Sequence, residues 1–288
     1  MRHFDTDSLE TLVTIIDRGG FTAAGDALGK TQAAVSVIVS RMEARIGKRL
    51  LERSRKGVTP TFAGEILIGY ARRILSLEDE ALAAIGGDEA AGRVRLAVPD
   101  DFVDMMVSPL IGAFSRRFPR VQLEMRCDLS FRLEPMLERG EVDLAIITQD
   151  PARPLGEVLR REPRAWCAAR DHRPELIDPL PLAMFPEGCR CRPDALAALD
   201  AMGKPWRIAY TSSHMPGIHS AVNAGMAITI LGISSIPKEW RRLGEEEGFP
   251  ELPHLDIALV VPANASVATK RFATFLRETV LQQEALAA

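Results

Sequence analysis

The sequence predicts a multidomain α+β protein, with an all-α winged helix-turn-helix at the N-terminus, then a long helix and a C-terminal α/β body. Three observations predict this class. Glycines divide the first 47 residues into three short helical segments, residues 62–85 form a nearly unbroken helical pattern, and strands alternate with helices beyond residue 92. The chain of 288 residues is 47% hydrophobic and 26% charged, and it contains no run of eighteen apolar residues, as is typical of a globular protein without a membrane span.

Helical spacing defines the first segment, which we expect to start with Thr6 or Asp7 as N-cap and to end at Gly19. Its apolar face consists of Leu9, Leu12, Val13 and Ile16. The residues before it carry acids where a secretory signal has a basic and then an apolar stretch, so we expect a cytoplasmic protein.

The second and third segments have the layout of a helix-turn-helix. Thr22 is the expected cap of a short helix that Gly29 ends, and Thr31 is the expected cap of the next. Gly25 supplies a small residue where the helices cross, and Gly29 tolerates the positive φ of the turn. The buried face of the third helix is expected to consist of Val35, Val39, Met42 and Ile46.

The opposite face of this third helix displays short side chains and one amide, a composition that suits a helix in the major groove of DNA. We assign base or phosphate contacts to Gln32 and Ser36, because Gln pairs with adenine and Ser reaches phosphate or base edges. Ala33 and Val37 are assigned to thymine methyl groups. The predicted contact face is completed by Thr31, Ser40 and Arg41.

A predicted wing of two strands follows the third helix and carries Arg53, Arg55 and Lys56 for phosphate or minor-groove contacts. Between residues 30 and 60 the sequence has eight basic and two acidic residues, a local excess of six positive charges in a chain whose net charge is −3. A three-helix unit with a merely solvated basic face is the alternative interpretation. The wing, the local charge and the long helix that follows favour nucleic-acid binding.

The helix over residues 62–85 exposes an apolar seam that needs a partner, and we expect it to pair with its twin in a homodimer. The seam includes Ile66, Leu67, Tyr70, Ile74, Leu77 and Leu82. The small and acidic segment GGDEAAG at residues 86–92 is the predicted linker to the body. In the body, the strand-helix alternation predicts a parallel-rich sheet, with a last helix from about Ser266 to Leu286 packed on its first half.

The stretch GGFTAAGDALGKTQAAVSVIVSRMEARIGKRLLERSRKGVTPTFAGE resembles the N-terminal winged helix-turn-helix of LysR-type transcriptional regulators, at many fixed positions between Leu9 and Leu67. The rest of the chain is similar, more weakly, to the family's linker helix and two-lobed effector-binding domain, which is like the periplasmic binding proteins. The resemblance implies a DNA-binding domain over residues 1–60, a linker helix and hinge over 61–92, lobe I over 93–163 plus 267–288, and lobe II over 164–266. The chain is then expected to cross between lobes near Pro163–Arg164 and near Pro262–Ser266.

The sequence departs from the family pattern at several positions. Val37, Ile38 and Ser40 stand where the family usually has polar or basic residues, so we expect fewer phosphate contacts from the helix and more from the wing. Leu51 replaces a usual Phe. Gly25 replaces a usual Ala, at an expected cost of about 0.5 to 1 kcal/mol in helix propensity.

The resemblance implies a small-molecule effector between the lobes, and ligands of open α/β sheets gather at the carboxyl ends of strands. The effector-binding candidates at strand ends are Asp100, Asp101, Phe102, Ser130, Thr148, Thr211 and Ser213. Two aspartates repel a carboxylate unless Arg126 or Arg132 compensates, so we expect a neutral or cationic effector, or one whose carboxylate lies away from Asp100. Alternatively, Asp100 or Asp101 caps the next helix.

We expect no catalytic residues, no metal site and no cofactor, because neither a nucleophile elbow nor a phosphate loop nor a carboxylate pair is present. Cys189-Arg190-Cys191 is either a redox or metal element or two thiols in a loop. The expected partners are double-stranded DNA, a small-molecule effector and further copies of the chain as dimer or tetramer, with RNA polymerase as a candidate and no membrane. A regulator without an effector and a solute-binding protein are the rival functions.

Overall fold

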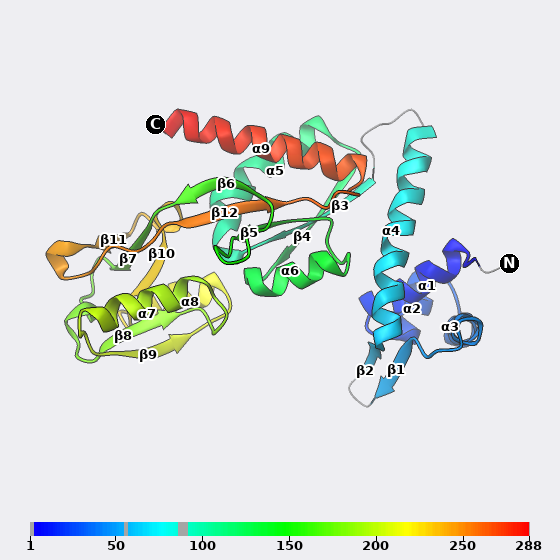
Figure 1. Ribbon diagram of the computed structural model, residues 1–288, viewed down its shortest axis with the longest axis horizontal. Coiled ribbons are helices and arrows are strands. Elements are labelled where there is room, and N and C mark those ends of the chain that lie inside the picture. Colours follow the sequence, from blue (N-terminus) through cyan, green and yellow to red (C-terminus); the bar gives the residue numbers. More distant parts are fainter. Residues whose placement is uncertain (1–2, 55–56, 86–91, 288) are drawn as a thin grey trace.

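The computed structural model describes residues 3–54, 57–85 and 92–287. An N-terminal helical unit and the second of two α/β lobes lie at opposite ends of the long axis, and a long helix stands beside the first lobe between them (Figure 1). The predicted linker residues 86–91 and the wing residues Arg55 and Lys56 lie outside the described ranges.

The N-terminal unit contains three helices and a two-stranded wing: α1 (Thr6–Asp17), α2 (Phe21–Leu28), α3 (Gln32–Ile46), β1 (Leu51–Ser54) and β2 (Gly57–Pro60). Its core joins all three helices through side chains that include Leu12, Phe21 and Val35. The predicted cap at Thr31 is confirmed, because its hydroxyl accepts a hydrogen bond of 3.2 Å from the Ala34 N–H. Two details were wrong. Asp5 and not Thr6 or Asp7 is the N-cap of α1, and Ile46, the last residue of α3, is 37% exposed and not part of the buried face.

Gly20 rather than Thr22 is the N-cap of α2, and Gly29 ends it at φ 63° as the turn required. The sequence predicted only a small residue at position 25, but the structure leaves no room for any side chain there. A Cβ at this position would lie 2.6 Å from the backbone carbonyl oxygen of Lys30 and 3.4 Å from the Gln32 nitrogen. The glycine therefore permits the close return of the chain into α3, and an alanine here would collide with backbone.

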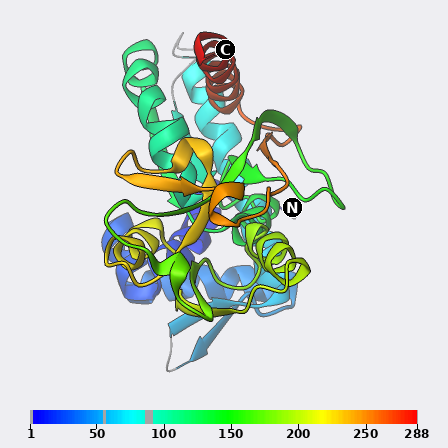
Figure 2. The same cartoon turned by 90° about the vertical axis from the view of Figure 1, so that its left-hand side faces the viewer.

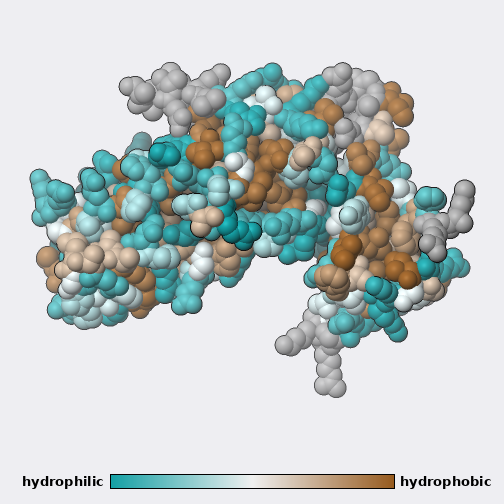
Figure 3. Space-filling model, in the orientation of Figure 1, coloured by the Kyte–Doolittle hydropathy of each residue, from teal (hydrophilic) through white to brown (hydrophobic). Residues whose placement is uncertain are grey.

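The long helix α4 (Phe62–Ile85) has 24 residues and begins where the Thr61 hydroxyl accepts a hydrogen bond from the Gly64 N–H. Hydrophobic residues gather along it on the molecular surface (Figure 3). Its exposed apolar side chains are Phe62, Ile66, Tyr70, Ile74, Leu77, Leu82 and Ile85. The opposite side packs on α1 through Ile68 and Ala71.

One arginine joins three parts of the chain. Arg72 on α4 is 8% exposed, and its guanidinium lies 2.5 Å from the Asp17 carboxylate at the end of α1 and 3.9 Å from that of Glu141 in lobe I. Close by, a Cβ at Gly69 would lie 3.3 Å from the carbonyl oxygen of Arg139. The linker helix is thus held against both the N-terminal unit and lobe I.

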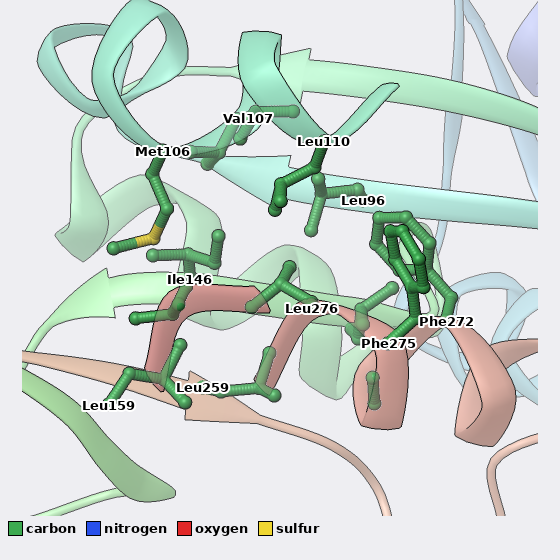
Figure 4. Packing of buried hydrophobic residues seen from close by; sticks show 14 of the residues in the cluster. Leu96, Met106, Val107, Leu110, Ile146, Leu159, Leu259, Phe272, Phe275 and Leu276 are labelled. Atoms are coloured by element: carbon green, nitrogen blue, oxygen red, sulfur yellow. The ribbon is translucent and has the colours of Figure 1, made fainter. Parts of the chain in front are cut away.

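Lobe I is a five-stranded sheet in the order β4-β3-β5-β12-β6. The strands are β3 (Gly92–Val98), β4 (Val121–Cys127), β5 (Leu144–Thr148), β6 (Glu157–Glu162) and β12 (Leu255–Val260). Helices α5 (Ser108–Arg117) and α9 (Val267–Ala287) cover one face, and α6 (Ser130–Glu138) covers the other (Figure 1). Phe272, Phe275 and Leu276 of α9 fill the core beside Leu96 and Leu110 (Figure 4). The predicted packing of the last helix on lobe I is confirmed.

Lobe II contains two small sheets, ordered β10-β7-β11 and β8-β9, which a bridge between Leu182 and Ile228 connects. Its elements are β7 (Arg164–Ala169), β8 (Leu180–Met184), α7 (Cys191–Ala201), β9 (Trp206–Thr211), α8 (Met215–Asn223), β10 (Thr229–Gly232) and β11 (Trp240–Leu243). Helices α7 and α8 flank these strands (Figure 2). Shorter helical turns cover residues 100–102, 103–107, 174–176, 233–235 and 245–247.

Two expectations about the body need correction. The first crossing at Pro163 is as expected, but the return does not lie at Pro262–Ser266. It lies between β11 and β12, because β12 already pairs with β5 and β6 of lobe I. The sheets are also more mixed than expected, since β12 runs antiparallel to both neighbours. An apolar run such as DIALVV is compatible with a central strand of either orientation in either lobe. The sequence pattern alone therefore does not determine the lobe or the direction of this strand.

Candidate nucleic-acid interface and ligand cleft

The third helix lies at the outer edge of the N-terminal unit, away from the two lobes (Figure 1). Gln32, Ala33, Ser40 and Arg41 are exposed, and Val37 is 47% exposed. Val35, Val39 and Met42 point into the core, which fixes the rotation of the helix about its axis. The short side chains therefore face solvent as a single surface near the helix N-terminus.

Arg53 of the wing connects three elements of this surface. Its guanidinium donates a hydrogen bond of 2.9 Å to the Ser36 hydroxyl on α3 and lies over the Phe21 ring of α2, 3.8 Å from the ring centroid. Sequence reasoning placed Arg53 and Ser36 on DNA separately and missed Phe21. Ser36 has an intramolecular partner, so its role at the surface includes holding the wing arginine. The other two predicted wing residues, Arg55 and Lys56, lie outside the described residues.

Glu43 attaches the wing to α3 from the inner side. Its carboxylate accepts backbone hydrogen bonds of 2.8 Å from Leu50 and 3.3 Å from Leu51, at the start of the first wing strand. On the sequence alone, Glu43 is only one of the two acidic residues between residues 30 and 60, with no structural role assigned to its side chain. These two hydrogen bonds fix the wing against α3. The basic residues of the wing are therefore held in one position relative to the helix.

The cleft between the lobes brings together three of the predicted effector residues. Asp101, Ser130 and Thr148 line a cavity of about 30 Å³, opposite lobe II residues 185, 188–191 and 230–232. The Ser130 hydroxyl accepts a hydrogen bond of 2.9 Å from the Thr148 N–H, so the start of α6 and the end of β5 form one polar wall.

Asp100 faces a second and larger interlobe cavity of about 540 Å³, which Asp101 also lines. The Asp100 carboxylate accepts a hydrogen bond of 2.5 Å from the Met215 N–H at the first residue of α8. The alternative that Asp100 caps the next helix is therefore wrong, because its carboxylate bonds the first turn of α8 in the other lobe and the segment after it has no side-chain cap. A carboxylate at a helix N-terminus is favourable because it satisfies a terminal N–H and the helix dipole.

Burial raises the pKa of the Asp101 carboxyl group to about 7, and the nearby charges of Asp100 and Glu162 act in the same direction. Removing a carboxylate from water disfavours its charged form. The wall of the larger cavity also carries Asp104. A neutral or cationic effector stays a prediction, and the three carboxyl groups of this cavity are its structural basis.

Other residues that the sequence suggested for the cleft do not line its two cavities. Phe102 is fully buried in the core of lobe I and cannot reach a ligand, because the turn after β3 points its ring inward. Thr211 and Ser213 line neither interlobe cavity within the described residues, since β9 lies at the edge of the lobe II sheet. The Arg132 guanidinium pairs with Asp128 at 3.4 Å and the Arg126 side chain is exposed, and no ion pair of the described residues joins either arginine to Asp100.

Several contacts tie the lobes together across the cleft, and sequence reasoning missed their residues in lobe II. Arg190 pairs with the Glu134 carboxylate at 2.5 Å and with that of Asp150 at 2.8 Å, both in lobe I. The Ser235 hydroxyl donates a hydrogen bond of 2.8 Å to the Asp101 carbonyl oxygen. Arg190 lies beyond the residues that directly follow β8 (Leu180–Met184), and its partners belong to the other lobe, so the strand-end rule did not find it.

Among the described residues, no group of three or more His, Cys, Asp or Glu side chains is arranged to hold a metal ion. A search of the same residues finds no helix with the length and apolarity needed to cross a membrane.

Comparison with known proteins gives one consistent answer. Residues 6–65 match the family described as bacterial regulatory helix-turn-helix protein, lysR family, and residues 87–281 match the LysR substrate binding domain. The chain is 33% identical to the HTH-type transcriptional regulator PecT of Dickeya dadantii, over 87% of this chain and 79% of PecT. It is 32% identical to the regulator DgdR of Burkholderia cepacia, over 90% of this chain and 88% of DgdR.

Solved structures share the fold over nearly the whole chain. ArgP from Mycobacterium tuberculosis has a TM-score of 0.69 at 19% identity, covering 96% of this chain and 98% of ArgP. Full-length CbnR complexed with its target DNA has a TM-score of 0.60 at 19% identity, covering 96% of this chain and 99% of CbnR.

A winged helix-turn-helix joined by a linker helix to a two-lobed ligand-binding body defines a transcriptional regulator that binds DNA and has an effector-binding domain. The chain belongs to the LysR family of such regulators.

Proposed function

We propose that the regulator reads its operator with α3, through Gln32 at base edges and Ala33 and Val37 at thymine methyl groups. The observation that supports this most directly is the exposed short-chained face of α3 braced by Arg53, which lies over Phe21 and donates to Ser36. Thr31, Ser40, Arg41 and Arg53 border that face and would contact phosphates, with Arg55 and Lys56 as further basic residues. That CbnR was solved with target DNA agrees with this role.

We propose that the protein works as a homodimer or tetramer in which α4 pairs with the α4 of a second copy. The exposed seam on this helix carries aromatic and aliphatic side chains that are 43% to 84% exposed in the single chain. A contiguous exposed apolar surface of this kind marks a protein interface. Two recognition helices one helical turn of DNA apart would suit a pseudo-palindromic operator.

The larger cleft cavity is the proposed effector site, and its three aspartates favour a neutral or cationic small molecule. An effector acts only by binding the open and closed lobe arrangements with different affinities. Helix α6 offers a route for the signal, because Ser130 at its start lines the neighbouring small cavity and Glu141 beyond its end pairs with Arg72 of α4.

The alternative function is a regulator without an effector, whose cleft is vestigial. The cross-lobe contacts of Arg190 and Ser235 support it, because they join the two lobes through the protein's own side chains. A solute-binding protein is disfavoured by the helix-turn-helix match. The curated relatives are regulators and not enzymes, and we propose no catalytic activity, cofactor or metal. RNA polymerase is a proposed partner, and the site of action is the cytoplasm, where bacterial duplex DNA lies.

Footprinting on the upstream DNA of the protein's own gene tests this function, with and without a panel of metabolites and at two salt concentrations. Protection of a pseudo-palindrome that weakens at high salt is the expected result. An effector-responsive regulator changes its footprint with one metabolite class, whereas the alternative function gives the same footprint throughout. Calorimetric titration with uncharged, cationic and dianionic metabolites then separates the ligand classes, and tight binding of a dianion contradicts the proposed site.

A further inference from the structure

A cavity of about 410 Å³ lies between the linker helix α4 and lobe I, and it shares no lining residue with the two interlobe cavities. Helix α4 contributes residues 72, 73, 76 and 77, and lobe I contributes the residues before β5 and the turn between β12 and α9. Val142 and Asp143 of the wall come directly before β5, whereas Thr148 at the other end of this strand lines the cleft. The junction cavity therefore lies at the opposite edge of the sheet from the cleft. Its volume is within the range of about 300 to 1,000 Å³ that is typical of small-molecule sites.

Apolar side chains from several elements form much of the wall of this junction cavity. Val142 and Val260 belong to a buried core cluster of lobe I, and Leu137 of α6 packs against that cluster. Helix α4 adds Leu77 from its own side. Because the fold of lobe I fixes three of these four side chains, the cavity offers a preformed apolar surface to the body of a small molecule.

The acidic residues of the wall are either paired or open to solvent. The Asp143 carboxylate accepts hydrogen bonds of 2.6 Å and 3.2 Å from the Arg95 guanidinium and one of 2.7 Å from the Arg95 backbone N–H. Glu134 pairs with Arg190 of lobe II at 2.5 Å, and Glu138 is exposed near the end of α6. None of them is a buried carboxylate that requires a cation from a ligand.

Arg73 of α4 is a cation whose contacts are with neutral groups. With its amide oxygen turned toward Arg73, Asn264 accepts hydrogen bonds of 2.9 Å and 3.1 Å from the guanidinium, which also lies over the Tyr70 ring at 5.5 Å. No carboxylate among the described residues forms an ion pair with Arg73. A guanidinium has five N–H donors in total, about three more than Asn264 uses, so Arg73 retains donors for an anionic ligand.

Arg72, which lines the same cavity, has one donor without an acceptor. Its side chain is 8% exposed, and its ion pairs are with Asp17 and Glu141. The buried Nε–H has no hydrogen-bond partner in the part of the chain that the structure describes. Buried N–H groups without a partner are rare in folded proteins, and an arginine can be satisfied only by an acceptor. The α4 side of the cavity therefore has an excess of donors over acceptors.

We propose that the junction cavity binds a small amphipathic carboxylic acid, whose carboxylate accepts hydrogen bonds from Arg73 and whose apolar body lies against Leu137, Val142 and Val260. Hydrogen bonds between an arginine and a carboxylate are charge-assisted and stronger than those to a neutral acceptor. This class of ligand is the opposite of the neutral or cationic class proposed for the cleft. The two sites are therefore distinguished by the charge of the molecule that each binds.

A ligand in the junction cavity contacts the linker helix and lobe I at the same time. It therefore favours the arrangement in which α4 lies against lobe I over any arrangement in which the two separate. Arg72 extends this contact to the N-terminal unit through Asp17, and Glu134 extends it to lobe II through Arg190. Ligand binding is thus coupled to the position of the DNA-binding unit relative to the body, with or without an effector in the cleft.

The test is a calorimetric titration of the full-length protein with three probes that share one apolar chain: octanoate, octanol and octylamine. We expect octanoate to bind at a single site per chain, about tenfold more tightly than octanol or octylamine, because only the carboxylate forms charge-assisted hydrogen bonds with Arg73. Octylamine binding as tightly as octanoate would overturn the proposal. If a second copy of the chain fills the cavity, octanoate does not bind, and the proposal fails.

Two variants in one turn locate the site. Ala265→Phe places a ring in the cavity wall and should abolish octanoate binding, whereas Ala263→Phe, at an exposed position outside the wall, should bind octanoate like the parent. Arg73→Gln should weaken octanoate binding about tenfold while octanol binding stays unchanged. Circular dichroism confirms that each variant is folded. Octanoate binding by Ala265→Phe at the affinity of the parent would contradict the proposed site.

Hydrogen exchange of the parent protein gives a test that does not depend on any variant. Octanoate should slow amide exchange in residues 137–143 and 260–266, which border the junction cavity, and leave residues 100–104 and 215–219 at the cleft unchanged. Protection confined to the cleft segments would place the probe in the proposed effector site and overturn this inference without touching the proposed function.

Discussion

Arg53 on the wing donates a hydrogen bond of 2.9 Å to Ser36 on the recognition helix while its guanidinium lies over the ring of Phe21. The wing, the recognition helix and the preceding helix therefore meet at one arginine. A lysine could supply the charge but not the planar stacking or the directed N–H group. The orientation of the wing on DNA depends on this contact.

Replacing Arg53 by alanine should weaken binding to all duplexes and lower the slope of log affinity against log salt by about 1, as for one lost phosphate contact. Replacement by lysine should retain most of the salt slope but lose affinity, because the stacking on Phe21 is lost. Fluorescence anisotropy with a labelled duplex at four salt concentrations measures both effects. Arg93→Ala, an exposed arginine of lobe I, is the matched control. An unchanged slope in Arg53→Ala would show that this residue does not face the phosphates.

Gly25→Ala should destabilise the protein by about 1 to 3 kcal/mol, since the new methyl group meets the Lys30 carbonyl oxygen at 2.6 Å. Helix propensity alone predicts the opposite sign, a gain of about 0.5 to 1 kcal/mol. Chemical denaturation monitored by circular dichroism measures the free energy of unfolding and shows whether the substitution destabilises or stabilises the protein. Gly112→Ala in α5 is the control, because only the flexible end of Arg116 lies near, at 3.5 Å, and a small stabilisation is expected there. Stabilisation by Gly25→Ala would refute the close contact.

Asp101 should make the folded protein less stable as the pH rises from about 4 to about 7. Its pKa in the folded state is raised to about 7 from 3.8, mainly by burial. Within this window the folded state binds the proton more tightly than the unfolded chain, so stability is greatest below the window and falls as the pH rises through it. The difference in Tm between Asp101→Asn and the parent should therefore grow in favour of the variant from pH 5 to pH 8. A difference independent of pH, like that expected for the exposed Asp104→Asn, would contradict the assignment.

Ile74→Glu should convert the oligomer to monomers, because it places a carboxylate in the middle of the apolar seam of α4. Sedimentation velocity at micromolar concentration measures the change, and Glu65→Ala on an exposed part of the same helix should leave the assembly intact. If the Ile74→Glu protein sediments like the parent while remaining folded, α4 does not form the interface.

The sequence predicted best where a local rule determines the structure. The Thr31 cap, the glycine turn and the 24-residue helix all follow from neighbouring residues, and the structure contains each of them. The sequence was a poorer guide where the structure depends on which distant strands pair with each other. The strand at 255–260 belongs to lobe I because of its partners β5 and β6, and its apolar composition does not specify them.

The cleft illustrates the same limit. Positions after strands suggested Asp101, Ser130 and Thr148, and the structure places these three residues at one cavity because their strand ends meet at one edge of the sheet. The same rule included Phe102, whose inward rotation depends on the turn after β3, and it missed Arg190, whose partners lie in the other lobe. The rule identifies chain positions, but side-chain direction and contacts between lobes require the tertiary structure.

The central claim is that the surface of α3 around Gln32 reads base edges. Its most direct test is a competition experiment in which the parent and Gln32→Ala select duplexes from a randomised library at physiological salt. The account predicts that the parent enriches one sequence, and that the variant loses discrimination at a single base position in each half-site, by about 1 to 3 kcal/mol, with its non-specific affinity unchanged. A parent protein without any sequence preference, or a variant that enriches the same sequence equally well, would contradict it.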